Sequence, residues 1–206
     1  DLHSFPTRRS SDLRNTINLW CKIVVACLPA AVIGLLFDDI LDKYLYNYVV
    51  VALMLIIYGI FFILIEKKNE HTRPQVTKLT ELTYQMALII GGFQVLALIP
   101  GTSRSGATIL GALLIGTSRY VATEFTFYLA IPVMFGASIL KVIKFGFHYT
   151  AIEVVILLVG CLVAFFVSVF AIKFLMGYIK KHDFKAFGYY RIVLGVLVLL
   201  YFLIFG

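Results

Sequence analysis

Residues 82–116 read LTYQMALIIGGFQVLALIPGTSRSGATILGALLIG, and this stretch decides the fold. Its first part, 82–100, carries no charge and is long enough to cross the ~30 Å apolar core of a bilayer, which takes about 20 helical residues. Its last part, 105–116, is apolar but reaches only about half that depth at ~1.5 Å per residue. The helix-breaking pair Pro100-Gly101 separates the two parts, so we predict a helix–break–helix unit instead of one straight span.

The composition of the whole chain agrees with a membrane location. Of 206 residues, 61% are hydrophobic and 14% are charged, against roughly 45–50% and about 25% in a soluble domain. This composition excludes a soluble enzyme, a nucleic-acid binder and a disordered chain. We predict an all-α polytopic membrane protein, whose +7 net charge favours anchoring at anionic lipid on the cytoplasmic side.

Hydropathy and loop charges predict the path of the chain. Five apolar runs are predicted to be spans: 17–37, 48–65, 125–140, 154–172 and 192–206, the last of which is expected to start near Ala186. The basic loops 66–81 and 173–191, the latter ending at Arg191 beside the last span, are predicted to be cytoplasmic, and the acidic loop 38–47 to lie outside. Residues 82–116 must then enter and leave on one side, so we predict five transmembrane helices and one re-entrant hairpin. Small residues of its second arm recur at four-residue spacing, which indicates close helix packing: Ala107, Gly111, Ala112 and Gly116.

The first thirteen residues differ in character from the rest. The segment 1–13, DLHSFPTRRSSDL, is polar and resembles the translation of a sequencing-adapter oligonucleotide, so we exclude it from the fold. The alternative is a genuine cytoplasmic tail. Residues 14–206 are predicted to form a single transmembrane domain.

The break between the two arms has the chemistry of an anion site. Arg104 is the only charge between Glu81 and Arg119, and four hydroxyls surround it: Thr102, Ser103, Ser105 and Thr108. Ser105 is expected to cap a helix that begins at Gly106, which directs free amides and the positive end of the helix dipole at a ligand. An arginine at membrane depth is expensive and therefore indicates function. An ordinary turn outside the membrane, with Arg104 as an anchor, is the alternative.

Three stretches carry a resemblance to a known family. They are LWCK and PAAVIG within 19–34, QVLALIPGTSRSGAT at 94–108 and SRYVATEFTFYLAIP at 118–132. The chain resembles the bacterial undecaprenyl-diphosphate phosphatases of the bacitracin-resistance type. The resemblance implies an inverted-repeat architecture with two re-entrant hairpins, of which residues 82–116 are the second. The glutamate-rich motif of the first hairpin is not found, and Glu66, Glu70 and Glu81 with His71 lie in a basic loop and are not assigned to it. We therefore expect the chain to be truncated at its N-terminus.

The resemblance also implies an activity and a set of site residues. The expected reaction is hydrolysis of undecaprenyl diphosphate to undecaprenyl phosphate and phosphate at the bacterial inner membrane, which recycles the carrier lipid of peptidoglycan synthesis. Arg104, Ser103 and Ser105 are the expected catalytic residues. The remaining expected contacts to phosphate are Gly101, Thr102, Gly106, Thr108 and Gln94. A divalent cation, Mg or Ca, is implied by the family, with its acidic ligands in the absent motif, so no metal ligand is assigned in this chain.

Other interpretations of the sequence stay open. A lipid-phosphate or small-anion transporter would use the same broken helices, and a scaffold without activity is a further alternative. Glu124 either lies near the cavity or, as we favour, starts a span and pairs with Arg119. The expected partners are a polyprenyl diphosphate lipid and the bilayer, without nucleic acid, and the sequence leaves self-association undecided. The cysteines Cys21, Cys27 and Cys161 lack metal-ligand spacing and are expected to be small hydrophobes.

Overall fold

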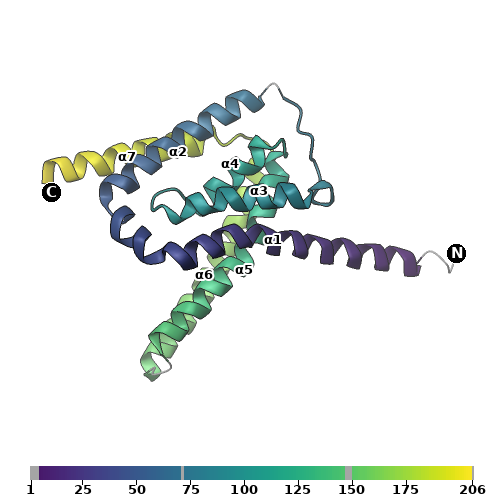
Figure 1. Cartoon of the computed structure of the whole chain (residues 1–206), viewed down its shortest axis with the longest axis horizontal. Helices are drawn as coiled ribbons and strands as arrows, with labels where there is room; N and C mark the ends of the chain where they lie inside the picture. Colours follow the sequence, from purple (N-terminus) through teal and green to yellow (C-terminus); the bar gives the residue numbers. More distant parts are fainter. Residues whose placement is uncertain (1–4, 71, 147–149, 206) are drawn as a thin grey trace.

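A computed structural model describes residues 5–70, 72–146 and 150–205, and every regular element in this part of the chain is helical. Seven α-helices and two short 3-10 turns follow one another (Figure 1). Their bounds are α1 Phe5–Leu45, α2 Tyr48–Asn69, η1 Leu79–Glu81, α3 Tyr84–Val95, η2 Leu96–Leu98, α4 Arg104–Leu114, α5 Arg119–Phe145, α6 Ala151–Ile179 and α7 Lys185–Phe205.

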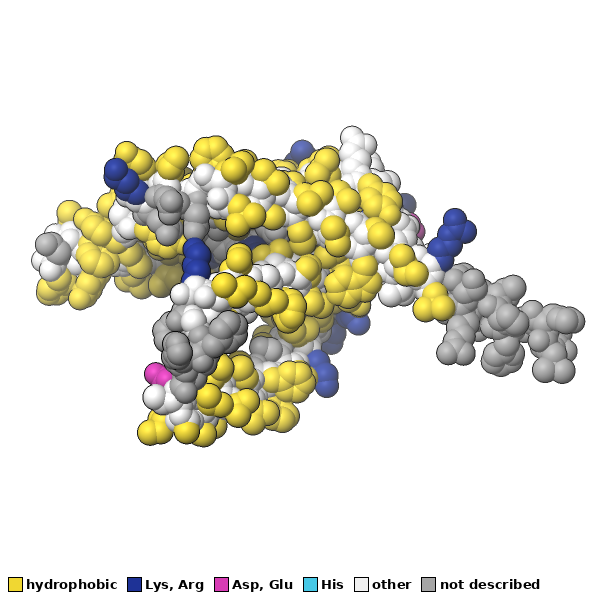
Figure 2. Space-filling model, turned by 60° about the horizontal axis from the view of Figure 1, so that its bottom comes forward, with side chains coloured by type: hydrophobic (Ala, Val, Ile, Leu, Met, Phe, Trp, Pro, Cys, Tyr) yellow, Lys and Arg dark blue, Asp and Glu magenta, His cyan; other side chains and the backbone are white. Residues whose placement is uncertain are grey.

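Five of these helices are long and apolar enough to cross a membrane. They contain the stretches Leu13–Phe37, Tyr48–Asn69, Arg119–Lys144, Ala151–Ile179 and Lys185–Phe205. Apolar side chains cover most of the visible surface in Figure 2, and lysines and arginines lie at its margins. An apolar surface of this kind is energetically favourable in contact with lipid tails and unfavourable in contact with water. The chain is thus an all-α multi-pass membrane protein, and the prediction of five spans is confirmed.

Residues 82–116 form the predicted hairpin. The arms α3 and α4 lie side by side (Figure 1), and a Cβ at Gly111 would come within 2.6 Å of the Phe93 ring. At the base, the amide of Gln75 donates to the carbonyl of Gly116 and the amide of Ser118 donates to that of Val76, both at 2.8 Å. The chain therefore enters and leaves the hairpin at the same end. Small residues in α4 allow this close approach of the two arms.

The break in the hairpin has local causes. Pro100 has no N–H to continue the helix and disfavours helical backbone at the residue before it, and Ile99 is extended with ψ 121°. Gly101 then adopts φ +88°, a conformation that glycine reaches without steric cost. The same glycine approaches α2 closely, because a Cβ would lie 2.4 Å from the Val51 carbonyl oxygen.

Glycines also bring α2 and α7 together as an antiparallel pair. A Cβ on Gly59 would lie 2.7 Å from the Gly188 carbonyl oxygen, and one on Gly195 would lie 2.8 Å from the Ala52 carbonyl oxygen. Both helices run together along the upper part of Figure 1. Backbone contact of this kind is how membrane helices gain van der Waals energy without a hydrophobic driving force. The pair forms a support on which the tip of the hairpin rests.

A second support is the core between α1, α3 and α5. Ile23, Ile90 and Phe125 come from these three helices and are fully buried. A Cβ on Gly91 would lie 2.2 Å from the Ala26 carbonyl oxygen, so α1 and α3 are also in backbone contact. In contrast, α6 leaves this body together with the end of α5 and buries none of its most apolar window (Figure 1).

The predicted loops are shorter in the structure than in the sequence analysis. The acidic stretch 38–47 is mostly helical, because α1 continues to Leu45, and only residues 46–47 connect it to α2. The basic stretch 173–191 is likewise divided between α6 and α7, with a connection at 180–184. Helices longer than the ~30 Å apolar core carry their charged ends out into the head-group region. The helix α1 also includes residues 5–13, and the origin of that segment stays a prediction.

Candidate functional site

The second arm of the hairpin begins two residues earlier than expected. The N-cap of α4 is Ser103, not Ser105, and its side-chain oxygen accepts a hydrogen bond from the amide of Gly106 at 3.3 Å. Ser103 has φ +68°, the only positive φ of a non-glycine residue in the described chain. Positive φ is costly for such a residue and clusters at functional sites. The expectation that Ser105 caps a helix beginning at Gly106 is therefore wrong.

This earlier start changes which amides are available. The amide of Gly106, expected to face a ligand, is used by Ser103 within the cap. The amides of Arg104 and Ser105 are in the first turn of α4 and have no acceptor within the helix. Two exposed hydroxyls lie in the same segment as these amides. They belong to Ser103 and Ser105, and their oxygens are 3.4 Å apart. The cap thus presents hydroxyl and amide donors on one short stretch of chain.

Arg104 lies at the centre of this stretch and is partly buried. Its Nη1 atom is buried without a hydrogen-bond partner among the described residues. A buried donor with no acceptor costs about 1–3 kcal/mol, and more when it is charged. An anion that accepts from Arg104 would remove this cost.

Two further predicted residues also have unpaired buried atoms. The Thr102 side chain is fully buried and its hydroxyl has no partner in the described chain. Gln94, in the last turn of α3, is 2% exposed, and both atoms of its side-chain amide lack a partner there. No hydrogen bond joins Gln94 to Arg104 among the described residues. Several unpaired polar groups in one apolar hairpin indicate a site for a polar ligand or water.

Thr108 was expected to contact phosphate, but its hydroxyl has a structural role. Its hydroxyl donates to the carbonyl oxygens of Arg104 at 3.1 Å and Ser105 at 3.2 Å, and it accepts from the hydroxyl of Thr126 at 3.0 Å. With its hydrogen used inside the helix, Thr108 does not offer a donor to phosphate in this arrangement. It connects the first turn of α4 to α5 instead.

The structure adds one residue that the sequence analysis placed elsewhere. Arg191 was predicted to mark the cytoplasmic edge of the last span, but it lies inside α7, partly buried, and reaches the break of the hairpin. Its Nη2 donates to the carbonyl oxygens of Gly101 at 2.6 Å and Thr102 at 2.8 Å. Its guanidinium also lies 5.9 Å from the centroid of the Tyr58 ring. The only sequence signal for this role is an arginine a full turn into an apolar helix.

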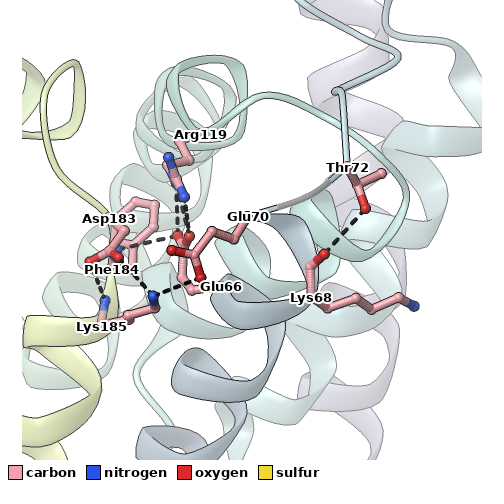
Figure 3. Close-up of polar contacts among 8 residues, drawn as sticks. All are labelled: Glu66, Lys68, Glu70, Thr72, Arg119, Asp183, Phe184 and Lys185. Atoms are coloured by element: carbon pink, nitrogen blue, oxygen red, sulfur yellow. Dashed lines mark hydrogen bonds and ion pairs between the residues drawn. The ribbon is translucent and has the colours of Figure 1, made fainter.

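The acidic residues after α2 have structural partners. The Glu66 side chain is fully buried. Its carboxylate accepts hydrogen bonds from Nε and Nη2 of Arg119, and this Nε lies 3.0 and 2.9 Å from the two carboxylate oxygens. It also accepts from the amide of Phe184 at 3.2 Å. Figure 3 shows the Arg119 guanidinium directed at the Glu66 carboxylate, with Lys185 between Glu70 and Asp183. The proposed pairing of Arg119 with Glu124 is therefore wrong, because Glu66 is the partner.

The donor set at the break fits an anion and not a cation. The Arg104 guanidinium repels a cation, and the sequence of the break contains no carboxylate of the kind that holds Mg²⁺ or Ca²⁺ in proteins. Among the residues whose side chains the structure describes, no group of three His, Cys, Asp or Glu residues could hold a metal. The residues described here do not fit a divalent cation, and we derive no step from one.

Fold and site together define a class of protein: a multi-pass membrane protein whose re-entrant hairpin presents an arginine and hydroxyl site for an anion such as phosphate. The family model of the bacitracin resistance protein BacA matches residues 2–197. The chain belongs to this family.

Curated relatives agree over most of the chain. An undecaprenyl-diphosphatase of Acetivibrio thermocellus is 62% identical over 190 residues, which cover 92% of this chain and 70% of the relative. One of Desulfitobacterium hafniense is 64% identical over 190 residues, with 92% and 68% covered. One of Enterococcus faecalis is 58% identical over 201 residues, with 96% and 73% covered.

Proposed function

We propose that this protein is an integral membrane phosphatase that hydrolyses undecaprenyl diphosphate to undecaprenyl phosphate and inorganic phosphate. The observation that carries the proposal is the unpaired Arg104 guanidinium at the capped break of a re-entrant hairpin. Relatives at 58–64% identity bear the name undecaprenyl-diphosphatase. The activity would recycle the carrier lipid of cell-wall synthesis at the bacterial inner membrane.

The site residues supply charge neutralisation and positioning. Over the whole reaction, the oxygen of a water molecule becomes bonded to the terminal phosphorus and releases a proton to solvent, while the bridging P–O bond breaks and leaves its electrons on the prenyl phosphate. Arg104 would bind the terminal phosphoryl group and stabilise the charge on its oxygens. The hydroxyls of Ser103 and Ser105 and the free amides of the first turn of α4 would donate to the same oxygens.

Arg191 would not contact the phosphate and would act through the backbone of the break. By donating to the carbonyls of Gly101 and Thr102 it orients the backbone immediately before the cap. A cap held in place before the substrate arrives needs no reorganisation during the reaction. We therefore assign Arg191 a positioning part and Arg104 the contact with substrate.

The test is phosphate release from a polyprenyl diphosphate by the full-length protein purified in detergent, where no membrane separates two compartments. We expect Arg104→Ala to reduce the rate by about 10²–10³-fold and the matched variant Lys144→Ala, at the exposed end of α5, to leave it unchanged. An equal rate in the Arg104 variant would overturn the site. Substrate binding without release by the unsubstituted full-length protein, measured by retention of labelled polyprenyl diphosphate, would favour the transporter.

A further inference from the structure

A cavity lies at the opposite end of α4 from the break. It has a volume of about 590 Å³ and is formed by the chain after α2, the exit of the hairpin, the start of α5 and the end of α6. The helix α4 separates it from the break by 11 residues, which is about 16 Å at 1.5 Å per residue. It is therefore not part of the phosphatase site. Its end of the molecule is the one that the basic loops predict to be cytoplasmic.

The charge in this cavity is positive. Three of the lining residues are cations, Arg73, Arg119 and Lys180, and the described lining contains no acidic side chain. Glu66 pairs with one of these cations, Arg119, whereas Glu70 and Asp183 bind Lys185, which is outside the lining (Figure 3). Among the described residues, neither Arg73 nor Lys180 has an acidic partner. The cavity thus has an uncompensated attraction for an anion.

Arg119 is held in a fixed orientation at the edge of the cavity. Glu66 accepts from its Nε and Nη2, which leaves its Nη1 group without a hydrogen-bond partner among the described residues. Its side chain is still 37% exposed. A guanidinium fixed by one carboxylate keeps donors in a defined direction, and such planar donors suit phosphate oxygens. Lys180 lies beside it, over the ring of Tyr120 at 5.4 Å.

A buried hydroxyl without a partner lies in the same wall. Thr117 is 3% exposed, and its Oγ1 has no hydrogen-bond partner in the described chain. Directly after it, Ser118 caps the 27-residue helix α5 by accepting from the amide of Val121. The amides of Arg119 and Tyr120 then have no acceptor within the helix. Hydroxyl, amides and three cations therefore surround one space, and the unpaired hydroxyl is the sign that a ligand oxygen is expected there.

We propose that this cavity binds a phosphodiester group, and that the group belongs to an anionic phospholipid of the cytoplasmic leaflet. Basic pockets between transmembrane helices on the cytoplasmic side take phospholipid head groups. The remaining walls support a lipid over a small ion, because Leu113, Pro74 and Ile179 are apolar and would contact the glycerol and the first methylenes. The lipid would join α2, α5 and α6 at this end of the molecule.

The experiment is native mass spectrometry of the detergent-purified protein with added phosphatidylglycerol or phosphatidylcholine, together with melting temperatures in the same lipids. We expect phosphatidylglycerol to be retained and to raise the melting temperature more than phosphatidylcholine does. The double variant Arg73→Ala/Lys180→Ala removes two cations of the cavity and is expected to weaken this binding about 30-fold. The matched control Lys67→Ala/Lys68→Ala removes two cations at the same end of the molecule that do not line the cavity. The Lys68 side chain points away from Arg119 (Figure 3).

Thr117→Val gives an independent test that does not change charge. Without lipid, we expect the variant to melt at the same temperature as the unsubstituted protein or higher, because it loses a buried hydroxyl that has no partner. The increase in melting temperature that phosphatidylglycerol causes is expected to be smaller in the variant. Inorganic phosphate tested alone distinguishes the source: a shift as large as that from phosphatidylglycerol would support the phosphate site and identify free phosphate as its ligand. Equal retention of the two lipids, or equal loss in the double variant and its control, would overturn the proposal. None of these measurements depends on phosphatase activity.

Discussion

The guanidinium of Arg191 in α7 donates a 2.6 Å hydrogen bond to the carbonyl oxygen of Gly101, ninety residues earlier in the chain. The contact joins the last helix to the tip of the re-entrant hairpin, and a second bond to the Thr102 carbonyl reinforces it. Gly101 and Ser103, on either side of Thr102, have positive φ angles of 88° and 68°. The unusual backbone before α4 is therefore held from outside the hairpin.

This contact predicts a loss of catalytic rate when Arg191 is removed. We expect Arg191→Ala to lower kcat by about 100-fold, because a displacement of about 1 Å at a positioned group has that effect, and to leave KM nearly unchanged. Steady-state phosphate release measures both constants. Restoration of kcat by millimolar guanidinium in the alanine variant would show that the group acts at the break. Unchanged hydrogen exchange of residues 99–108 in this variant would contradict the positioning part.

Two neighbouring glycines predict opposite outcomes in the first arm. Gly91→Ala places a methyl group 2.2 Å from the Ala26 carbonyl oxygen, and we expect it to separate α1 from α3 and destabilise the protein by about 1–3 kcal/mol. Gly92 is exposed and a Cβ there would meet nothing within 4 Å. Gly92→Ala is therefore the matched control, with stability equal or slightly higher. Thermal unfolding in detergent measures both, and equal melting temperatures would argue against the close contact of α1 and α3.

The ion pair between Glu66 and Arg119 predicts non-additive stability. Arg119→Leu leaves the fully buried Glu66 carboxylate without its cation, at a cost of about 3–5 kcal/mol. The double variant Glu66→Leu/Arg119→Leu removes both charges, and we expect it to be more stable than Arg119→Leu alone. Melting temperatures of the four proteins complete the cycle. Additive losses would mean that the two side chains do not interact.

A pH dependence is expected at the entrance of the hairpin. The Glu81 carboxylate accepts hydrogen bonds from the amides of Thr77 at 2.9 Å and Lys78 at 3.2 Å, and these bonds to its charged form lower its pKa. Because the folded-state pKa is below the unfolded value of about 4.3, the stabilisation is present above that value and is lost as the pH falls through the folded pKa. We expect Glu81→Gln to melt below the unsubstituted protein at pH 7 and the difference to shrink at acid pH. A difference that does not vary with pH would exclude this origin.

The number of spans, the existence of the hairpin and the position of its break could all be predicted from the amino-acid sequence. Each of these features depends on residues that are neighbours in the sequence. The length of an apolar run identifies a span, and the break follows because Pro100 removes a backbone donor and Gly101 tolerates positive φ. The same local reasoning selected Arg104 and the hydroxyls around it. It misplaced the helix cap by two residues, because Ser103 and Ser105 are both good caps and only the backbone distinguishes them.

Only the tertiary structure decided which distant groups meet. Arg191 has the sequence context of an anchor at the edge of a span, yet the close α2–α7 pair brings it to the hairpin. Glu66 has the context of a loop acid, yet it binds Arg119, 53 residues later. Hydropathy and helix signals describe each segment alone, whereas the partner of a long charged side chain depends on how the helices pack. In an apolar surrounding an unpaired charge is costly, so a charged side chain there either finds a partner in another helix, as Arg191 and Glu66 do, or, as we propose for Arg104, binds a ligand.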